Sequence, residues 1–218
     1  MYAWRTSYGP VELAFTDRLG GVSAARSDFA PADAICEMRQ VHGARSVVAG
    51  TEREPEADAM VTAEDGVTLV VRVADCVPIL FADRVARVVG VAHAGRKGLA
   101  AGVVQSAIQG MRGQGAVNIV AWIGPYICGA CYEVPEEMRD EISTHIPATR
   151  ATTSWGTPSL DLGAGVRDIL IRSGVEIMES PTLCTRESVS LFSYRRDGDA
   201  AGRQAGLIRI RPERGEAA

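Results

Sequence analysis

The sequence lacks an apolar run long enough to cross a membrane. A membrane-spanning helix needs about 20 consecutive, mostly apolar residues, and the most apolar part of this chain is interrupted by Arg72, Asp75 and Asp83. The N-terminal stretch MYAWRTSYGP also lacks the apolar core of a secretory signal. We therefore expect a cytoplasmic protein with no membrane partner.

Two further signals are missing from the composition. The chain has 23 lysines and arginines against 27 acidic residues, so its overall charge gives no reason to expect nucleic acid as a partner. Its five cysteines are an odd number, and without a secretory signal they indicate reduced thiols rather than a disulfide framework. Because the net charge is negative, any site for an anion must be built from a local group of cations.

The sequence does contain enough apolar residues for one sizeable core. Of its 218 residues, 46% are apolar and 23% are charged, which is ordinary for a globular protein. This length favours a single domain over residues 1–218. Short runs rich in β-branched residues predict strands covered on both faces, at 67–74, 77–83, 87–94 and 118–124.

Helical signals lie between and after these runs. Residues 135–146 open with proline and two acids, and residues 160–175 have Asp161 as an N-cap and Gly174 as a stop. Strands and helices in this order predict an α/β or α+β domain. A third helix is predicted over 96–115 from the spacing of Leu99, Val103, Val104, Ala107 and Met111.

Three polar segments mark the expected connections. Residues 51–59, TEREPEADA, are interpreted as a surface loop, and residues 147–159, rich in Thr, Ser and Pro, as a linker or excursion. Asp197-Gly198 predicts a turn that leads towards a strand at 206–210.

Two of the apolar runs end near residues that bind metals. Cys76 ends VRVADC, His93 lies in VGVAHAG, and His42 is another of only three histidines in the chain. Histidine and cysteine are good zinc ligands, and three protein ligands leave a fourth tetrahedral position open for water, as in catalytic sites. The residues therefore suggest a zinc site built from His42, Cys76 and His93.

Simpler interpretations exist for each of these residues. A cysteine in an apolar segment most often serves packing, and a histidine beside glycine is more often a hydrogen-bonded loop residue. The separations of 34 and 17 residues match no compact zinc motif. The metal site is favoured because Cys76 and His93 fall at predicted strand ends, where α/β proteins place their sites.

Other motifs carry weaker signals. Cys128 and Cys131 form CGAC, which suits half a zinc site or a redox couple, whereas the H-x-E motif of zinc nucleobase deaminases is absent. HAGRKG (93–98) precedes a predicted helix, so it suits either an anion site or a glycine turn with two solvated cations. His145 is expected to be only a cation at a helix end.

An ordered set of segments resembles one known family. The set covers most of the chain and resembles the bacterial laccase-domain, or polyphenol oxidase, family, now regarded as purine nucleoside phosphorylases with adenosine deaminase activity. The segments are FTDRLGGVS (15–23), QVHG (40–43), EADAMVT (56–62), ADCVPILF (74–81), VAHAG (91–95), IGPYICGACYEV (123–134), LDL (160–162) and LFSYRRDGDAAGRQAGLI (191–208).

The resemblance implies an α+β fold with mixed β-sheets flanked by helices, similar to certain cysteine hydrolases. It implies that His42, Cys76 and His93 bind zinc, and that the substrates are purine nucleosides (adenosine, inosine, methylthioadenosine) with inorganic phosphate. Copper is named for some of the family, but three histidines could not supply the multi-histidine motifs of true laccases. The protein is expected to be a monomer or homodimer.

The chain departs from the family pattern at three places. The stretch between GGVS and QVHG is short, and the usual Cys-Cys-Tyr-Glu is Ala130–Glu133. The usual HAGWRG is HAGRKG, so a tryptophan is lost and Lys97 replaces an arginine, which keeps the charge but loses bidentate geometry. These changes bear on substrate preference and activity more than on the metal site.

Roles for further residues follow as hypotheses. In phosphorolysis, phosphate attacks C1′ of the ribose as the purine leaves, and the cations proposed to hold it are Arg18, Arg45 and Lys97. In deamination, water activated by zinc adds to C6 of adenine. Cys131, a further candidate catalytic residue, or Glu133 would then pass a proton to the departing ammonia. Asp75 is a candidate to orient a metal ligand.

Two other classes of function are alternatives to a zinc-dependent nucleoside phosphorylase. The first is a cysteine hydrolase with Cys76 as nucleophile and His93 as base, which would suit the peptidoglycan editing linked to related proteins. The second is a zinc-binding module without catalysis, which the changes at Arg96 and Lys97 favour.

Overall fold

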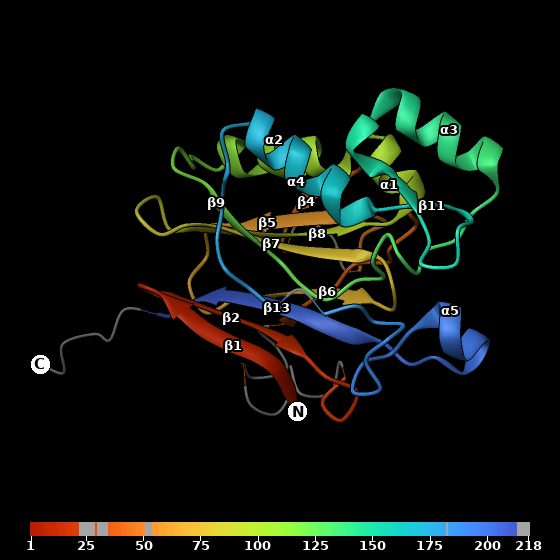
Figure 1. The fold of residues 1–218 in the computed structure, drawn as a ribbon. Coiled ribbons are helices and arrows are strands. Elements are labelled where there is room, and N and C mark those ends of the chain that lie inside the picture. Colours follow the sequence, from red (N-terminus) through yellow and green to blue (C-terminus); the bar gives the residue numbers. More distant parts are fainter. Residues whose placement is uncertain (22–28, 30–34, 51–53, 182, 213–218) are drawn as a thin grey trace, which may run out of the picture.

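The computed structural model describes residues 1–21, 29, 35–50, 54–181 and 183–212. It has three layers, because helices cover one face of a six-stranded sheet and a five-stranded sheet lies against the other face (Figure 1). The predicted α+β class, with mixed sheets flanked by helices, is confirmed. Within the described ranges, no helix has the length and apolar character that crossing a membrane requires.

The six-stranded sheet is antiparallel at its centre and parallel at its edges. Its order is β12-β9-β7-β8-β5-β4. The pairs β7-β8, β7-β9 and β5-β8 are antiparallel, whereas β4-β5 and β9-β12 are parallel. The strands are β4 (Ser46–Val48), β5 (Ala59–Thr62), β7 (Val77–Asp83), β8 (Val88–Ala94), β9 (Val120–Ile123) and β12 (Glu176–Ile177).

The five-stranded sheet joins strands from both ends of the chain. Its order is β1-β2-β13-β6-β3, and only the β3-β6 pair is parallel. The strands are β1 (Tyr2–Tyr8), β2 (Val11–Thr16), β3 (Ile35–Cys36), β6 (Thr68–Val73) and β13 (Gln204–Ile210). The C-terminal strand therefore lies between β2 and β6 and closes the fold.

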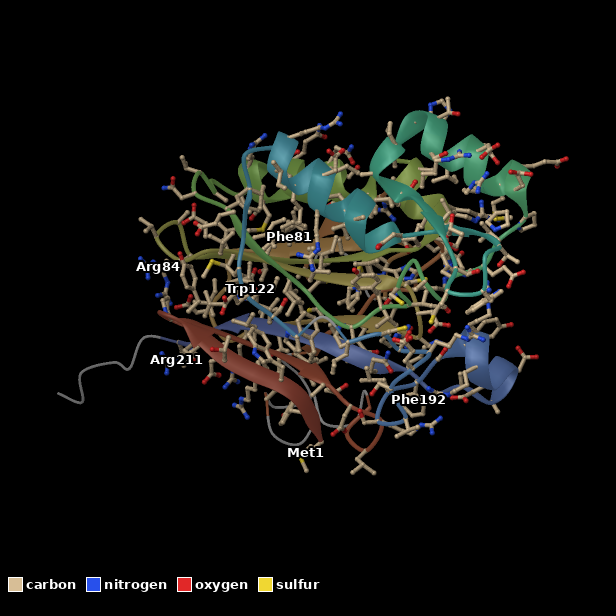
Figure 2. The ribbon with its side chains drawn as sticks, viewed as in Figure 1. Met1, Phe81, Arg84, Trp122, Phe192 and Arg211 are labelled. Atoms are coloured by element: carbon tan, nitrogen blue, oxygen red, sulfur yellow. The ribbon has the colours of Figure 1, made fainter. Side chains whose placement is uncertain are left out.

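The central strands β7 and β8 are covered on both faces, as their continuous hydrophobicity predicts. Every residue of both strands is buried, and successive side chains of a strand point to opposite faces. Ile79 and Phe81 pack towards the helices, whereas Leu80 and Ala82 pack between the two sheets. Figure 2 shows Phe81 on the helix side of the sheet, while Trp122 of β9 lies on the side of the other sheet.

The helix predicted over 96–115 is two helices. α1 (Arg96–Ala100) and α2 (Val103–Gly113) are separated at Gly102, whose φ of 91° lies in the left-handed region that glycine tolerates. The predicted apolar face is correct, because the residues that defined it are all buried in the core beneath the helices: Leu99, Val103, Val104, Ala107 and Met111.

The later helices begin and end close to where the sequence predicts. α3 spans Glu136–His145 and α4 spans Leu162–Arg172. The carboxylate of Asp161 accepts a hydrogen bond of 2.8 Å from the N–H of Ala164, so the predicted N-cap is confirmed. The predicted turn at Asp197-Gly198 joins α5 (Tyr194–Asp197) to the short 3₁₀ helix η4 (Gly198–Ala200), and β13 follows.

Two of the polar segments follow their predictions only in part. Residues 147–159 form an excursion rather than a linker, because η3 (Pro147–Thr149) leads into a hairpin of β10 (Arg150–Thr152) and β11 (Pro158–Leu160). Threonine is β-branched and suits strands as well as loops. Residues 51–59 were predicted to be a surface loop, and residues 51–53 lie outside the described part. The prediction is wrong for the end of this segment, because Ala57, Asp58 and Ala59 are buried.

Two connections cross from the five-stranded sheet to the six-stranded sheet. Residues 74–76 join β6 to β7, and residues 37–45 join β3 to β4. Each crossing contains a non-glycine residue with positive φ, Asp75 at 88° and His42 at 60°, a conformation uncommon for residues with a side chain. Both crossings meet the C-terminal end of β8 at the wall of one cavity.

Asp83 fastens the opposite end of β7. Its carboxylate accepts hydrogen bonds from the backbone N–H groups of Val85, Ala86, Val117 and Asn118, at 2.7–3.0 Å. Burial alone would raise the pKa of Asp83, but these donors outweigh it and lower the pKa below its ordinary value. The carboxylate thus ties the β7–β8 turn to the segment that precedes β9.

We predict that Asp83→Asn lowers the free energy of unfolding by about 1–3 kcal/mol, because an amide NH₂ would face two of the N–H donors. A carboxylate whose pKa is lowered by folding stabilises above its unfolded pKa and loses this effect as the pH falls through the folded pKa. Urea unfolding at neutral and acidic pH should show the difference from wild type narrowing in acid. Asp168→Asn, which breaks only a surface pair with Arg172, is the control, and an equal loss there would contradict the prediction.

Candidate metal centre and its cavity

Three side chains that are far apart in the sequence meet in one cluster. The ligand atoms of His42, Cys76 and His93 all lie within 4.8 Å of one another. The Sγ of Cys76 is 3.9 Å from Nε2 of His42, and the two imidazole rings meet edge to face with centroids 4.7 Å apart. The residues that the sequence suggested as metal ligands are therefore adjacent in space.

The two-sheet architecture positions each member of this cluster. His93 lies on β8 in register with Pro78 and on the strand face that Val89 and Val91 turn towards the other sheet. Cys76 is the last residue of the short crossing into β7, not the end of a strand, and His42 lies in the longer crossing. The cluster thus forms where the two sheets meet.

Asp58 holds two parts of the cluster together. Its Oδ1 accepts a 2.7 Å hydrogen bond from Nδ1 of the buried His93. The same carboxylate accepts bonds of 2.7–3.2 Å from the backbone N–H groups of Val41, His42 and Gly43. Burial alone would raise the pKa of Asp58, but His93 and these N–H groups lower it. The ionised Asp58 keeps the proton on Nδ1, so Nε2 of His93 faces the cluster.

Cys76 and His93 form a charge-stabilised pair. Burial alone would raise the pKa of Cys76, but hydrogen bonds with His42 and His93 lower it to about 6. Burial alone would lower the pKa of His93, but its bonds with Asp58 and Cys76 raise it to about 9. The site therefore favours a thiolate, which is the form of cysteine that binds metals or acts as a nucleophile.

Two glycines leave the room that the cluster occupies. A Cβ at Gly95 would lie 2.6 Å from Cδ2 of His42 and 3.1 Å from Sγ of Cys76. A Cβ at Gly98 would lie 2.7 Å from the carbonyl oxygen of Gly43. The distances of 2.6 Å and 2.7 Å are too short for real Cβ contacts. HAGRKG therefore needs both glycines to bring α1 against the segment that carries His42.

The cluster borders a cavity of about 870 Å³. Its apolar wall includes Val73, Ile127 and Leu162, and its aromatic groups are Tyr132 and Tyr194. Besides the histidines of the cluster, five arginines among the described residues line it: Arg39, Arg72, Arg96, Arg195 and Arg203. Positive side chains thus gather around one cavity in a chain whose net charge is negative, an arrangement typical of a local anion site.

Tyr132 brings two of these arginines close to the cluster. The guanidinium of Arg195 lies 5.1 Å from the centre of the Tyr132 ring, in a cation–π contact. Burial, and then the charge of nearby Cys76, raise the pKa of Tyr132, although Arg96 and Arg195 act in the opposite direction. Tyr132 therefore keeps its phenolic proton, and it connects the arginine side of the cavity to the thiolate side.

Asp75 links two segments of the chain and is not bonded to a predicted metal ligand among the described contacts. Its Oδ1 accepts a 2.5 Å hydrogen bond from the hydroxyl of Thr185, and its Oδ2 accepts a 2.6 Å bond from the backbone N–H of Arg195. No described bond joins its carboxylate to a side chain of the cluster. Asp75 instead fastens residues 185–195 to the crossing that carries Cys76.

The cations that the sequence suggested for phosphate lie elsewhere. Arg18 pairs with Asp197 at 2.6 Å, and Arg45 donates to the carbonyl of Glu56 at 3.1 Å. Lys97 is exposed on α1, whereas its neighbour Arg96 lines the cavity. In the described part of the chain, none of the three lines the cavity.

The residues suggested as proton carriers also lie outside the cavity lining. Glu133 is exposed and accepts a 2.7 Å bond from the indole N–H of Trp155. Cys131 is buried, and its thiol belongs to a second cluster with Cys128 and Cys184. Burial and then the neighbouring thiol of Cys184 raise the pKa of Cys128 to about 12, opposite to the direction at Cys76.

Comparison of the sequence with known families assigns the chain to one of them. Residues 22–211 match the family described as multi-copper polyphenol oxidoreductase laccase. The chain belongs to this family. The resemblance drawn from the sequence segments is therefore confirmed.

Curated relatives and solved structures extend this result. A protein of Streptomyces coelicolor named a purine nucleoside phosphorylase is 44% identical, over 95% of this chain and 99% of the relative. One of Streptomyces griseus with the same name is 45% identical, over 92% and 94%. The crystal structure of a Neisseria meningitidis protein matches with a TM-score of 0.80 at 30% identity, over 96% of this chain and 99% of the other.

The cluster suits the metal that the family resemblance implies. Two imidazoles and a thiolate are the donor types that zinc prefers, and three protein ligands are typical of catalytic zinc sites. The hydrogen bond from Nδ1 of His93 to Asp58 is the supporting contact that metal-binding histidines usually make. His42, Cys76 and His93 would hold the ion, and multi-histidine copper centres do not fit a chain with three histidines in total.

We predict that Gly95→Ala weakens zinc binding at least about tenfold, because the added methyl group would displace both His42 and Cys76. The fold should persist, since the φ of −77° at Gly95 suits alanine. Zinc affinity measured by competition with a chromophoric chelator, beside circular dichroism, tests this. Gly113→Ala is the control, because its Cβ would meet nothing within 4 Å; equal affinities in the two variants would refute the proposed arrangement.

Proposed function

We propose that the protein is a zinc-dependent purine nucleoside phosphorylase that accepts adenosine, inosine and methylthioadenosine. The observation that carries this proposal is one cavity that joins a thiolate–imidazole cluster to an arginine-rich lining. The relatives named purine nucleoside phosphorylase, at 44% and 45% identity, support it.

The cavity has the size and lining that these substrates require. Its volume of about 870 Å³ is within the usual range for small-molecule sites, roughly 300–1,000 Å³. Tyr132 and Tyr194 offer aromatic surfaces for a purine, and the apolar wall formed by Ile127 and Leu162 would exclude water from the reacting centre. The neighbouring arginines would hold the phosphate.

Arg96 and Arg195 are the phosphate ligands that we propose in place of Arg18, Arg45 and Lys97. Both line the cavity and both influence Tyr132, which lies beside the thiolate of Cys76. Guanidinium groups hold phosphate oxygens through two parallel hydrogen bonds. Phosphate at this position would lie between the arginines and the cluster, next to the place where a ribose can bind.

In phosphorolysis, a phosphate oxygen forms a bond to C1′ of the ribose while the bond from C1′ to the purine nitrogen breaks. The purine leaves with the bonding electrons and must gain a proton. Tyr132, which keeps its phenolic proton at neutral pH, is placed to donate a hydrogen bond to the departing base. A bound zinc ion would supply Lewis acidity and lower the pKa of a bound water towards about 7.

We include adenosine deamination as a second reaction of the same cavity. It consumes water at C6 of adenine and releases ammonia, and the observation that favours it is a ligand set of only three side chains, which leaves room for water beside the substrate. Asp58 supports this reaction indirectly, because it fixes which nitrogen of His93 faces the cluster.

A cysteine hydrolase is the second candidate function. Cys76 with its lowered pKa, His93 and Asp58 form the nucleophile, base and orienting acid that such enzymes use. This arrangement would need no metal and no phosphate. A binding module without catalysis would need metal but would convert no nucleoside.

Incubation with inosine, adenosine and methylthioadenosine, with and without phosphate and chelator, separates these functions. We expect hypoxanthine from inosine only when phosphate is present, ammonia from adenosine regardless of phosphate, and loss of both after zinc removal or in His93→Ala. Absence of any nucleoside turnover by the zinc-loaded protein would contradict the proposal. Alkylation of Cys76 without chelator would then favour the hydrolase, whereas a Cys76 thiol that is protected until metal is removed would favour the binding module.

Two adjacent cations provide a matched test of phosphate binding. We predict that Arg96→Gln raises the KM for phosphate at least about tenfold, because it removes a bidentate ligand. Lys97→Gln should stay close to wild type, since Lys97 is exposed and outside the lining. Initial rates at varied phosphate measure both variants, and a larger effect at Lys97 would contradict our assignment.

A further inference from the structure

A second group of metal-binding side chains lies outside the cluster described above. One ligand atom from each of Cys128, Cys131, Cys184 and Glu187 lies within 4.8 Å of the others. The sequence arranges them as two pairs, Cys-x-x-Cys and Cys-x-x-Glu, each with two residues between the ligands. This spacing is typical of the paired half-sites of structural zinc centres.

The backbone brings the two pairs together. The first pair follows β9, and the second lies in the segment between β12 and α5. A bridge between Tyr126 and Cys184 aligns the two segments, and the N–H of Thr185 donates to the carbonyl of Tyr126 at 3.0 Å. The N–H of Cys128 also points at the Sγ of Cys184, at 3.5 Å.

We propose that Cys128, Cys131, Cys184 and Glu187 form a second zinc site, which is structural and separate from the catalytic cluster. Four protein ligands complete a tetrahedral zinc ion and leave no position for a substrate, whereas three leave one open. Soft thiolates select zinc over magnesium or calcium, which prefer oxygen ligands. The ion would therefore hold the chain together rather than take part in the reaction.

The surroundings suit such an ion. Cys131 is 4% exposed and Cys184 is partly exposed, so the thiols are shielded, while Glu187 lies at the surface and covers the outer side. Three thiolates and one carboxylate would leave a zinc site with excess negative charge. Burial and then the neighbouring Cys184 raise the pKa of Cys131, and a hydrogen bond with Arg186 acts in the opposite direction. The guanidinium of Arg186 also lies 4.7 Å from the centre of the Trp155 ring.

The site would clamp one wall of the catalytic cavity. Ile127 and Tyr132, on either side of the first pair, line that cavity, as do Tyr194 and Arg195, which follow the second pair. The hydrogen bond from Thr185 to Asp75 already links the same segment to the crossing that carries Cys76. An ion shared by the two segments would fix the separation of the purine-facing and phosphate-facing residues.

Metal analysis of the purified full-length protein tests the proposal. We expect about two zinc ions per chain in the wild type and about one in Cys76→Ser and in Cys131→Ser, because each variant removes one ligand from one site. Cys131→Ser should also lower the Tm by about 5 °C or more, since a structural ion contributes to folding stability. Cys36→Ser, which alters the cysteine outside both clusters, should retain both ions and the wild-type Tm.

A cobalt experiment covers the case in which Cys131→Ser fails to fold. Cobalt-loaded Cys76→Ser should retain a strong thiolate-to-cobalt absorption, because three thiols remain in the second site. One zinc ion per chain in the wild type that Cys131→Ser retains, no such absorption, or a mass that shows a disulfide among Cys128, Cys131 and Cys184 would each overturn the proposal. Loss of nucleoside turnover in Cys76→Ser alone would leave it standing, since that reaction belongs to the other site.

Discussion

The hydrogen bonds of one buried carboxylate hold the proposed active site together. Asp58 lies just before β5 and accepts one bond from His93 on β8 and three from the backbone of residues 41–43. A buried carboxylate is costly unless it is fully paired, so this cost is offset only when β8 and the His42 crossing are both in place. The hydrogen bonds that offset the cost of burying Asp58 therefore also position His42 and His93, two of the three proposed metal ligands.

The rest of the site follows from the meeting of two sheets. The crossing of only three residues between β6 and β7 forces Asp75 into a positive φ, and this places Cys76 at the sheet junction beside His93. Asp75 is held there by Thr185 and by the backbone of Arg195. One side of the cavity, where the two sheets meet, thus carries the proposed metal ligands. Its arginines come from several parts of the chain, and the C-terminal segments supply Arg195 and Arg203.

The two thiol clusters differ in the way their surroundings treat charge. At Cys76 two imidazoles favour the thiolate and lower its pKa to about 6, whereas at Cys128 burial and neighbouring thiols raise the pKa to about 12. The first environment suits a metal and a reacting substrate, because three ligands would leave an open position. The second offers four candidate ligands, none of them among the described residues that line the cavity, which suits an ion that holds two segments in place.

The sequence by itself determined the local features of this protein. Continuous hydrophobicity predicted that β7 and β8 are covered on both faces, spacing predicted the buried face of α1 and α2, and Asp161 was predicted as a cap. These features depend on side chains that are neighbours in the chain. The ligand chemistry of His42, Cys76 and His93 suggested that group, and the family resemblance implied it as well. Only the tertiary structure decided that Arg96 faces the cavity while Lys97 faces solvent, that Asp58 is buried within an acidic segment, and that Cys184 and Glu187 complete the pair at Cys128 and Cys131. Each of these depends on how the two sheets and their crossings pack. The periodicity of the sequence does not tell which residues far apart in the chain come into contact.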